Sequence, residues 1–369
     1  SAPSEIISTS EYTNEFYPVA AEGSLIDGNI YSVPAYYDGL VLVYNRDHFE
    51  EIEQTEAPTA WEEFRRLAIS LTEFSGEGDD QKVVRAGAAV GNADNIDHFS
   101  DILGLLWAQA GLDIPREIDS EAAQDALDFY IGLLEEHKVW RGDFPEATTA
   151  FVNEQVSMIF VPSWQIIDIL KSNPSLNIGV APPPQVVSDN PTNWATYWSY
   201  AVPANADNKQ EAWEFIDYLT QEDSQITYHQ EAAKVRPFGP AFSLVSLKDE
   251  LDLDPYLGPV IETAPTATSA EIAARSGNSK QVEAPMKILA IETSCDETAA
   301  AIVEDGVSLI SSSVASSSDL HEKTGGIVPE IAARKQVEFI VPIIQEVLEK
   351  AYLNLDDIDK FAVTSGPGL

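Results

Sequence analysis

Helical and strand-like patterns of hydrophobic positions alternate along residues 1–261. Three segments have apolar residues at helical spacing, and we expect them to be helices. Two of these begin with a capping box, Thr59 with Glu62 and Asn208 with Glu211. The three segments are "PTAWEEFRRLAISLTEF", "SEAAQDALDFYIGLLEEHK" and "NKQEAWEFIDYLT", and the short apolar runs that predict strands are "YSVPAYY", "GLVLVYN", "VSMIFVP", "NIGVAPPP" and "YWSYAVP". Strands that alternate with helices indicate an α/β fold.

The pattern changes at residues 262–285, where the apolar period fades into "ETAPTATSAEIAARSGNSKQVEAP". We interpret this stretch as a linker or as a shortened terminal helix. Residues 286–369 then predict three strands, a long helix and a fourth strand, with Pro342 expected to kink the helix or divide it. The strands are "MKILAIETS", "TAAAIVEDG", "VSLISSSVAS" and "DKFAVTS", and the helix covers Val337 to Ala351. The sequence therefore predicts two folded parts, 1–261 and 286–369.

The chain is strongly acidic, with 61 Asp and Glu against 21 Lys and Arg and a formal net charge of -40. Such a charge repels nucleic-acid phosphates and anionic membranes, so we expect no nucleic-acid partner; it also suits a soluble, salt-tolerant surface. The single cysteine, Cys295, excludes an internal disulfide. No apolar run approaches the roughly 18 residues that a membrane-spanning segment needs. The sequence opens at Ser1 without a methionine or leader and stops after a predicted turn, so we expect both ends to be truncated.

Candidate chemistry in residues 1–261 comes from aromatic side chains. Tyrosine and tryptophan combine a flat apolar face with a polar group, which suits stacking on a sugar ring. Neighbouring residues of a strand face opposite sides, so Trp198 and Tyr200 share one face while Tyr197 lies on the other. Part of the set is therefore expected to pack in the core. The aromatic candidates are Tyr36, Tyr37, Trp164, Trp194, Tyr197, Trp198 and Tyr200.

Five segments in a fixed order carry a resemblance to a known family. The order and spacing of these segments, from about Glu15 to Leu257, resemble the extracellular solute-binding proteins of ABC sugar importers. One difference is that family members have strand and helix units before the "DGNIY" stretch, which are absent here, so the first lobe is expected to be incomplete. The segments are "DGNIYSVPAYYDGLVLVYNRDHFEE", "TAWEEFRRLA", "FVNEQVSMIFVPSWQI", "NPSLNIGVAPPPQ" and "NWATYWSYAVPANADNKQEAWEFIDYLT".

The resemblance implies two α/β lobes, joined by a hinge, that close on a sugar. It implies no cofactor for residues 1–285, the membrane subunits of an ABC importer as partners, and a location at the cell surface or in the periplasm. In such proteins the residue at the position of Trp164 commonly stacks on the sugar, and those at Tyr36 to Asp38 line the facing lobe. Trp194, Trp198 and Arg236 complete the expected sugar site.

An enzyme is the alternative for residues 1–261, because aromatic and carboxylate side chains also describe the site of a glycosidase. The motifs of other enzymes are missing: no two of the five histidines stand at metal-ligand spacing, and neither G-x-S-x-G nor a phosphate-binding glycine loop occurs. A binding protein is therefore favoured over an enzyme for this part.

A polar turn opens residues 286–369 and holds Ser294, Asp296, Glu297 and Thr298. Hydroxyl and backbone N–H groups there could meet a phosphate, and the carboxylates could hold a divalent ion. The same residues could equally form an ordinary polar hairpin. Cys295 lies beside an acid, which disfavours its thiolate, so it is not expected to be a nucleophile.

Three motifs, "ILAIETSCDETAAAIV", "DLHEKTGGIVPEIAARKQVEFIVPII" and "IDKFAVTSGPGL", resemble the N-terminus of the tRNA threonylcarbamoyladenosine transferase family, once described as O-sialoglycoprotein endopeptidase. The resemblance implies a partial lobe of the actin-like ATPase (ribonuclease H-like) fold in a cytoplasmic enzyme. It implies that Asp296 and Glu297 lie near metal and substrate, and that Gly366 and Gly368 lie near the cleft. Divalent metal and ATP are expected only for a complete version, since the histidine pair that binds metal in this family comes later than Leu369.

The two resemblances imply activities in different compartments. Our hypothesis is a truncated sugar-binding protein fused at Pro285–Met286 to the start of a transferase that is inactive by itself. Carbohydrate capture for an ABC importer is the favoured function. The alternative is tRNA N6-adenosine threonylcarbamoyl transfer, represented only by its N-terminal part.

Overall fold

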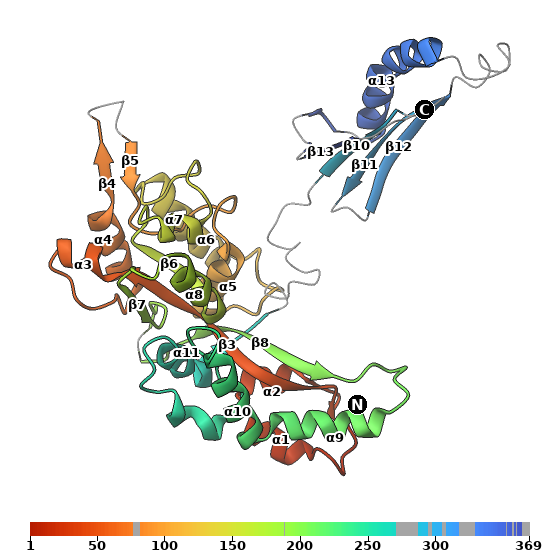
Figure 1. Cartoon of the computed structure of the whole chain (residues 1–369). Coiled ribbons are helices and arrows are strands. Elements are labelled where there is room, and N and C mark those ends of the chain that lie inside the picture. Colours follow the sequence, from red (N-terminus) through yellow and green to blue (C-terminus); the bar gives the residue numbers. More distant parts are fainter. Residues whose placement is uncertain are drawn as a thin grey trace. The chain divides into compact units, whose positions relative to one another are not determined.

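The computed structural model forms two compact units, residues 1–279 and 280–369 (Figure 1). Both units mix helices and strands, which confirms the α/β class. Of the expected linker, residues 262–270 belong to the first unit and the rest lies outside the described residues. The structure describes residues 1–76, 82–187, 189–270, 287–293, 297–304, 308–316, 329–351, 353–355, 358 and 360–363.

The first unit is built around one long strand, β3 (Ser32–Asn45). Its sequence is almost continuously apolar, as is usual for a strand that is covered on both faces. The first half of β3 pairs antiparallel with β8 (Asn193–Ala201), and its second half pairs with β6 (Met158–Pro162) and with β7 (Ile178–Ala181). A short strand, β9 (Ala267–Thr268), adds in parallel to the start of β8.

The sequence predicts two strands where the structure has only β3. The prediction separates them at Asp38, a residue that disfavours strands. In the structure Asp38 stays in the ladder, opposite Thr196 of β8, because its carboxylate is hydrogen-bonded inside the protein. The single strand β3 therefore pairs with β8 along its first half and with β6 along its second half.

Helices gather around the two halves of β3 as two lobes (Figure 1). The lobe around β8 holds the hairpin β1 (Leu25–Ile26)–β2 (Asn29–Ile30) and the helices α1 (Thr9–Glu15), α2 (Pro18–Gly23), α9 (Lys209–Thr220), α10 (Glu222–Ala233) and α11 (Gly258–Thr263). The lobe around β6 holds the hairpin β4 (Glu73–Ser75)–β5 (Lys82–Arg85) and the helices α3 (Arg46–Glu51), α4 (Trp61–Leu71), α5 (Phe99–Gln109), α6 (Glu121–Glu135), α7 (Ala147–Val152) and α8 (Ser163–Ser172).

The three helices expected from periodicity are present as α4, α6 and α9, but their caps differ from the prediction. The Thr59–Glu62 capping box is wrong, because α4 begins later, after Ala60, and the Thr59 N–H donates instead to Glu63 Oε2 at 3.2 Å. Asn208 does precede α9, yet its side chain makes no capping bond. The local sequence thus predicted where the helices lie more accurately than the residues at which they begin and the capping bonds there.

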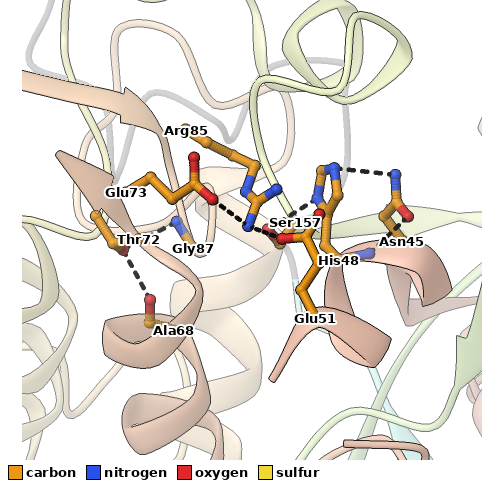
Figure 2. Close-up of polar contacts among 9 residues, drawn as sticks. All are labelled: Asn45, His48, Glu51, Ala68, Thr72, Glu73, Arg85, Gly87 and Ser157. Carbon is orange, nitrogen blue, oxygen red and sulfur yellow. Dashed lines mark hydrogen bonds and ion pairs between the residues drawn. The ribbon is translucent and has the colours of Figure 1, made fainter. Parts of the chain in front are cut away.

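A polar cluster joins α3 to the hairpin β4–β5 and to the residue before β6 (Figure 2). Arg85 pairs with Glu51 at 2.5 Å and with Glu73 at 2.9 Å. Beside it, Nδ1 of the buried His48 lies 3.0 Å from Ser157 Oγ. The cluster therefore holds together segments that are far apart in the sequence.

In the part of the second unit that the structure describes, one helix packs against a four-stranded sheet. The strands lie in the order β12-β11-β10-β13, and only β13 runs parallel to its neighbour. The helix is α13 (Pro329–Ala351), and its core contacts include Ile343 and Val347 against Leu289 and Ile302 of the sheet. The strands are β10 (Lys287–Glu292), β11 (Glu297–Glu304), β12 (Ser308–Ser316) and β13 (Lys360–Val363).

The four strands expected for this unit are confirmed, whereas division of its helix at Pro342 is wrong. Pro342 lies inside one continuous helix. A proline removes one backbone hydrogen bond, but burial of Ile343 and Val347 just after it keeps the helix on the sheet. Ser311 adds a further link by donating to the Val347 carbonyl at 2.8 Å.

Candidate functional site

A cavity of about 250 Å³ lies in the first unit where the two lobes meet along β3. The lobe around β6 contributes the first turn of α8, and the lobe around β8 contributes α10 and the segment after it. Its wall is formed by Tyr36, Tyr37, Asp38, Ser163, Trp164, Ile167, Trp198, Tyr228, Arg236, Phe238, Gly239, Pro240 and Ala241. Six of the seven residues expected to bind sugar are therefore brought together, and Trp194 is not.

Aromatic faces dominate the accessible surface of this cavity. Trp198 is 54% exposed and Trp164 is 37% exposed, values that are high for tryptophan. Tyr36 and Trp198 are paired across β3 and β8, and their ring centroids are 6.1 Å apart with 33° between the planes. Flat apolar faces on both lobes, with polar groups at their edges, can hold a sugar ring by stacking.

Asp38 lies in the wall with its oxygens directed into the protein. Oδ1 accepts the N–H of Gly39 and the N–H of Ser163, both at 2.8 Å, and Oδ2 accepts the Ser163 hydroxyl at 3.0 Å. Burial raises the pKa of this carboxyl to about 6, although these hydrogen bonds act to lower it. Since Ser163 opens α8, the carboxylate also lies at the positive end of that helix. Asp38 therefore fixes the first turn of α8 on β3.

His98 supports Trp164 from the side of α5. The two rings lie edge to face, with centroids 6.0 Å apart and 72° between the planes. Nε2 of His98 is 2.5 Å from Gln165 Oε1, and its Nδ1 is 3.0 Å from Asp101 Oδ2. The α8 turn that carries Trp164 is thus held from two directions, by β3 and by α5.

Trp194, expected in the sugar site, lies in the core instead and does not line the cavity. Its indole is only 1% exposed, and Nε1 donates to Asp101 Oδ1 at 3.1 Å. The indole lies so close to α5 that a Cβ on Gly104 would come within 2.5 Å of it. Trp194 lies at the start of β8, under α5, whereas Trp198 lies further along the same strand, where it is 54% exposed.

Tyr37 lines the cavity but cannot present its ring to a ligand. It is 1% exposed, and its hydroxyl lies 3.3 Å from Thr263 Oγ1 in α11. Burial raises its pKa above the ordinary range for tyrosine. Its neighbour Tyr36, on the other face of β3, is only partly buried and lines the cavity.

Sequence reasoning missed Tyr228 and Phe238. Tyr228 comes from α10 and is 53% exposed at the cavity wall. Phe238 is buried and stacks on Tyr256, with centroids 5.5 Å apart. The one available signal was a large aromatic on α10, a helix whose single buried residue is Gln225.

Arg236 follows α10 and lines the cavity, as the sequence suggested. Its Nε is buried and has no hydrogen-bond partner among the residues that the structure describes. The positive charge of Arg236 also acts on Tyr36. Burial raises the pKa of the Tyr36 hydroxyl, and Arg236 acts to lower it.

The transferase-like candidates of the second unit fall mostly outside the described residues. Ser294, Asp296, Gly366 and Gly368 are not described. Glu297, expected in the turn, and Thr298, expected where the turn meets the second strand, both lie in β11, and Thr298 is 1% exposed. No group of three potential metal-ligating side chains occurs within the described ranges.

The two parts of the chain match the models of different families. A family model of bacterial extracellular solute-binding proteins matches residues 4–258. A second model, of tRNA N6-adenosine threonylcarbamoyltransferase, matches residues 308–369. In the described part of the chain, no helix combines the length and apolarity that a membrane span requires.

Solved structures with a similar fold are solute-binding proteins. The GacH receptor of Streptomyces glaucescens, studied unliganded and with acarbose, is 20% identical with a TM-score of 0.56, and the match covers 75% of this chain and 70% of that one. A protein of Thermotoga lettingae bound to alpha-D-tagatose is 22% identical, with a TM-score of 0.54 and coverage of 70% and 66%. These likenesses confirm the two-lobe fold.

Curated transferases are similar to the C-terminal part of the chain. The tRNA N6-adenosine threonylcarbamoyltransferase of Kosmotoga olearia is 60% identical over 84 residues, and that of Brachyspira hyodysenteriae is 58% identical over the same length. In each case the match covers 23% of this chain and 25% of the relative. The chain thus spans about a quarter of the length of these relatives.

Proposed function

Because the chain belongs to the family of bacterial extracellular solute-binding proteins, we propose that its first unit binds a carbohydrate in the cavity between Trp164 and Trp198. The observation that carries the proposal is that two tryptophans from different lobes expose their rings to one cavity. Exposed indoles are costly in water, and a sugar C–H face covers them while its hydroxyls keep their hydrogen bonds.

The arrangement of lobes supports capture by closure. Only a few strand residues connect the halves along β3, so the lobes can rotate about this connection and enclose a ligand. Binding would then stabilise the closed form by as much as the ligand prefers it over the open form. In this proposal the unit works outside the cytoplasmic membrane, at the cell surface or in the periplasm, and delivers sugar to the membrane subunits of an ABC importer.

The test is a thermal melt of the full chain with a panel of neutral and acidic di- and oligosaccharides. All seven tryptophans lie within residues 61–213, so tryptophan fluorescence reports on the first unit alone. A ligand present at about 100 times its Kd should raise the Tm by about 5 to 10 °C. Trp164→Ala should weaken binding about 10- to 100-fold, because it removes one stacking face.

The matched control is Phe215→Ala, which removes another aromatic ring that is 59% exposed and does not line the cavity. It should leave the ligand-induced shift unchanged. If no carbohydrate of the panel shifts the Tm, or if Trp164→Ala and Phe215→Ala respond alike, the assignment of the cavity to sugar is wrong.

A second candidate function concerns the second unit, and the identity of 58–60% over 84 residues favours it. It is transfer of a threonylcarbamoyl group to tRNA, with a divalent metal and ATP as the expected cofactors of a complete enzyme. We expect no catalysis from this unit as it stands, because the matched quarter of the relatives would supply only part of such a site.

A further inference from the structure

We propose that the carbohydrate held in this cavity is anionic, a sugar with a uronic acid carboxylate that pairs with Arg236. This inference rests on the proposed function and narrows it to a class of ligand. It follows from the state of Arg236 in the structure and from the charges around the cavity.

Arg236 differs from every other arginine of residues 1–270. Among the described residues, no hydrogen bond or ion pair engages its guanidinium, and its Nε is buried without a partner, whereas Arg85, whose Nε is also buried without a partner, is paired through Nη2. The other six are each bonded to a carboxylate or a carbonyl. They are Arg46, Arg65, Arg66, Arg85, Arg116 and Arg141.

An unpaired arginine is unexpected in this molecule, which has 61 acidic side chains against 21 basic ones. Carboxylates within the protein are therefore abundant enough to pair with an arginine. A buried N–H without an acceptor costs about 1–3 kcal/mol, more when the group is charged. That cost persists in the unliganded fold because the guanidinium faces the cavity, where an acceptor can come from a ligand.

The cavity itself offers Arg236 no free carboxylate. Among the described residues of the wall, Asp38 is the only acidic one, and its oxygens already accept hydrogen bonds from Gly39 and Ser163. Around Arg236 the accessible surface is aromatic, with Tyr36 and Trp198 on the same lobe. A cation that shares a cavity wall with aromatic rings and makes no bond within the described residues is suited to an acidic sugar, whose ring stacks while its charge pairs.

The geometry of the guanidinium favours a planar anion. Its forked donors match the two oxygens of a carboxylate, and a sulfate ester offers the same fork. The net charge of -40 repels anions at long range, so an anionic sugar needs a local cation to bind. Of the lining residues that the structure describes, Arg236 is the one cation.

The experiment is isothermal titration of the full chain with three probes: α-1,4-linked trigalacturonate, neutral α-1,4-linked galactotriose and galactose 6-sulfate. Trigalacturonate should bind at least about 10-fold more tightly than galactotriose, since a charge-assisted pair is gained. Arg236→Gln should abolish this preference and weaken the binding of trigalacturonate about 10- to 100-fold. Arg66→Gln is the control, because it makes the same charge change on α4, outside the cavity.

The outcomes separate the two proposals. Preference for galactotriose, or equal binding of the two trisaccharides by wild type and Arg236→Gln, overturns the anionic ligand and leaves carbohydrate capture standing. Preference for galactose 6-sulfate over trigalacturonate assigns the anion to a sulfate ester and overturns the uronic acid. If none of the probes binds and the wider sugar panel also gives no Tm shift, both proposals fail together.

Discussion

The carboxylate of Asp38 accepts both the backbone N–H of Ser163 at 2.8 Å and its hydroxyl at 3.0 Å. Asp38 belongs to β3, which links the lobes, and Ser163 is the first residue of α8 in the lobe around β6. Trp164 follows immediately after Ser163. The position of the exposed indole therefore depends on a contact that the strand between the lobes makes with one helix.

This contact predicts a pH dependence of stability. Burial raises the pKa of Asp38 from 3.8 to about 6, so the fold takes up a proton at a pH where the unfolded chain has lost it. Stability from this group is therefore fully present below about pH 4 and is lost as the pH rises to about 6. Relative to Asp38→Asn, the wild type should lose about 3 kcal/mol of unfolding free energy across that range.

Urea unfolding followed by tryptophan fluorescence, at steps from pH 4 to pH 7, measures this difference. Asp207→Asn is the control, since Asp207 is exposed and lies outside the cavity. A constant difference between wild type and Asp38→Asn over this range would mean that burial does not govern the Asp38 carboxyl.

A second prediction concerns the packing of α5 on Trp194. In Gly104→Ala the new Cβ would lie 2.5 Å from two atoms of the indole, which is much closer than carbon atoms approach. Overpacking costs about 1–3 kcal/mol, and this outweighs the gain of up to about 1 kcal/mol from replacing glycine in a helix. The variant should therefore unfold at lower urea concentration than wild type.

Gly132→Ala in α6 is the matched control. Its Cβ would meet only the Glu136 carboxyl, at 4.0 Å, so no overpacking offsets the gain in helix propensity. The variant should therefore be at least as stable as wild type. If both alanine variants are stabilised, Trp194 has room to move and its tight packing against α5 is not rigid.

The sequence predicted the elements of the fold better than their partners. Helical periodicity located α4, α6 and α9, and alternation on β8 correctly separated Trp198 from its neighbours. It could not separate Trp198 from Trp194, because both positions face the same side of the strand. What differs is the cover: α5 packs over Trp194 and leaves Trp198 open, and that contact lies between residues about 90 apart in the sequence.

The electrostatics of the site were also hidden from the sequence. Asp38 appeared as a residue that would face a ligand, but Ser163 follows it by 125 positions, and the sequence gives no sign that α8 donates hydrogen bonds to its oxygens. Arg236 was expected in the site, but nothing in the sequence showed that it would have no ion-pair partner among the described residues. Its unpaired state follows from which carboxylates lie near it, and this depends on the complete fold.

A third prediction concerns the second unit. ATP with Mg²⁺ should leave its melting transition unchanged, because a partial site gains little binding energy and stabilisation requires a ligand that prefers the folded form. Since the tryptophans report only on the first unit, the measurement is calorimetry of the full chain with and without ATP and Mg²⁺. A reproducible upward shift of one transition that EDTA reverses would show that these residues bind nucleotide.

The last prediction concerns the acid limit of the lobe around β6, where His48 is buried beside Arg85 and within hydrogen-bond distance of Ser157 (Figure 2). Burial lowers the pKa of His48 from 6.5 to about 4, and the nearby Arg85 acts in the same direction, whereas Glu51 and Asp47 oppose it. The fold therefore holds a neutral ring at a pH where the unfolded chain binds a proton. Stability from this group is present above about pH 6.5 and is lost as the pH falls towards 4, by about 3 kcal/mol at most.

His48→Gln keeps a polar side chain opposite Ser157 but cannot titrate, so it should lose stability less steeply than wild type between pH 6.5 and pH 4. His137→Gln, at a less buried position outside the cluster, should follow the wild-type curve. The measurement is urea unfolding by tryptophan fluorescence at half-unit pH steps. His48 and Asp38 change stability with opposite signs within overlapping pH ranges. If the two sites act independently, the change in unfolding free energy of the double variant should equal the sum of the changes in the two single variants. Parallel curves for wild type and His48→Gln would show that the cluster of Figure 2 tolerates an imidazolium.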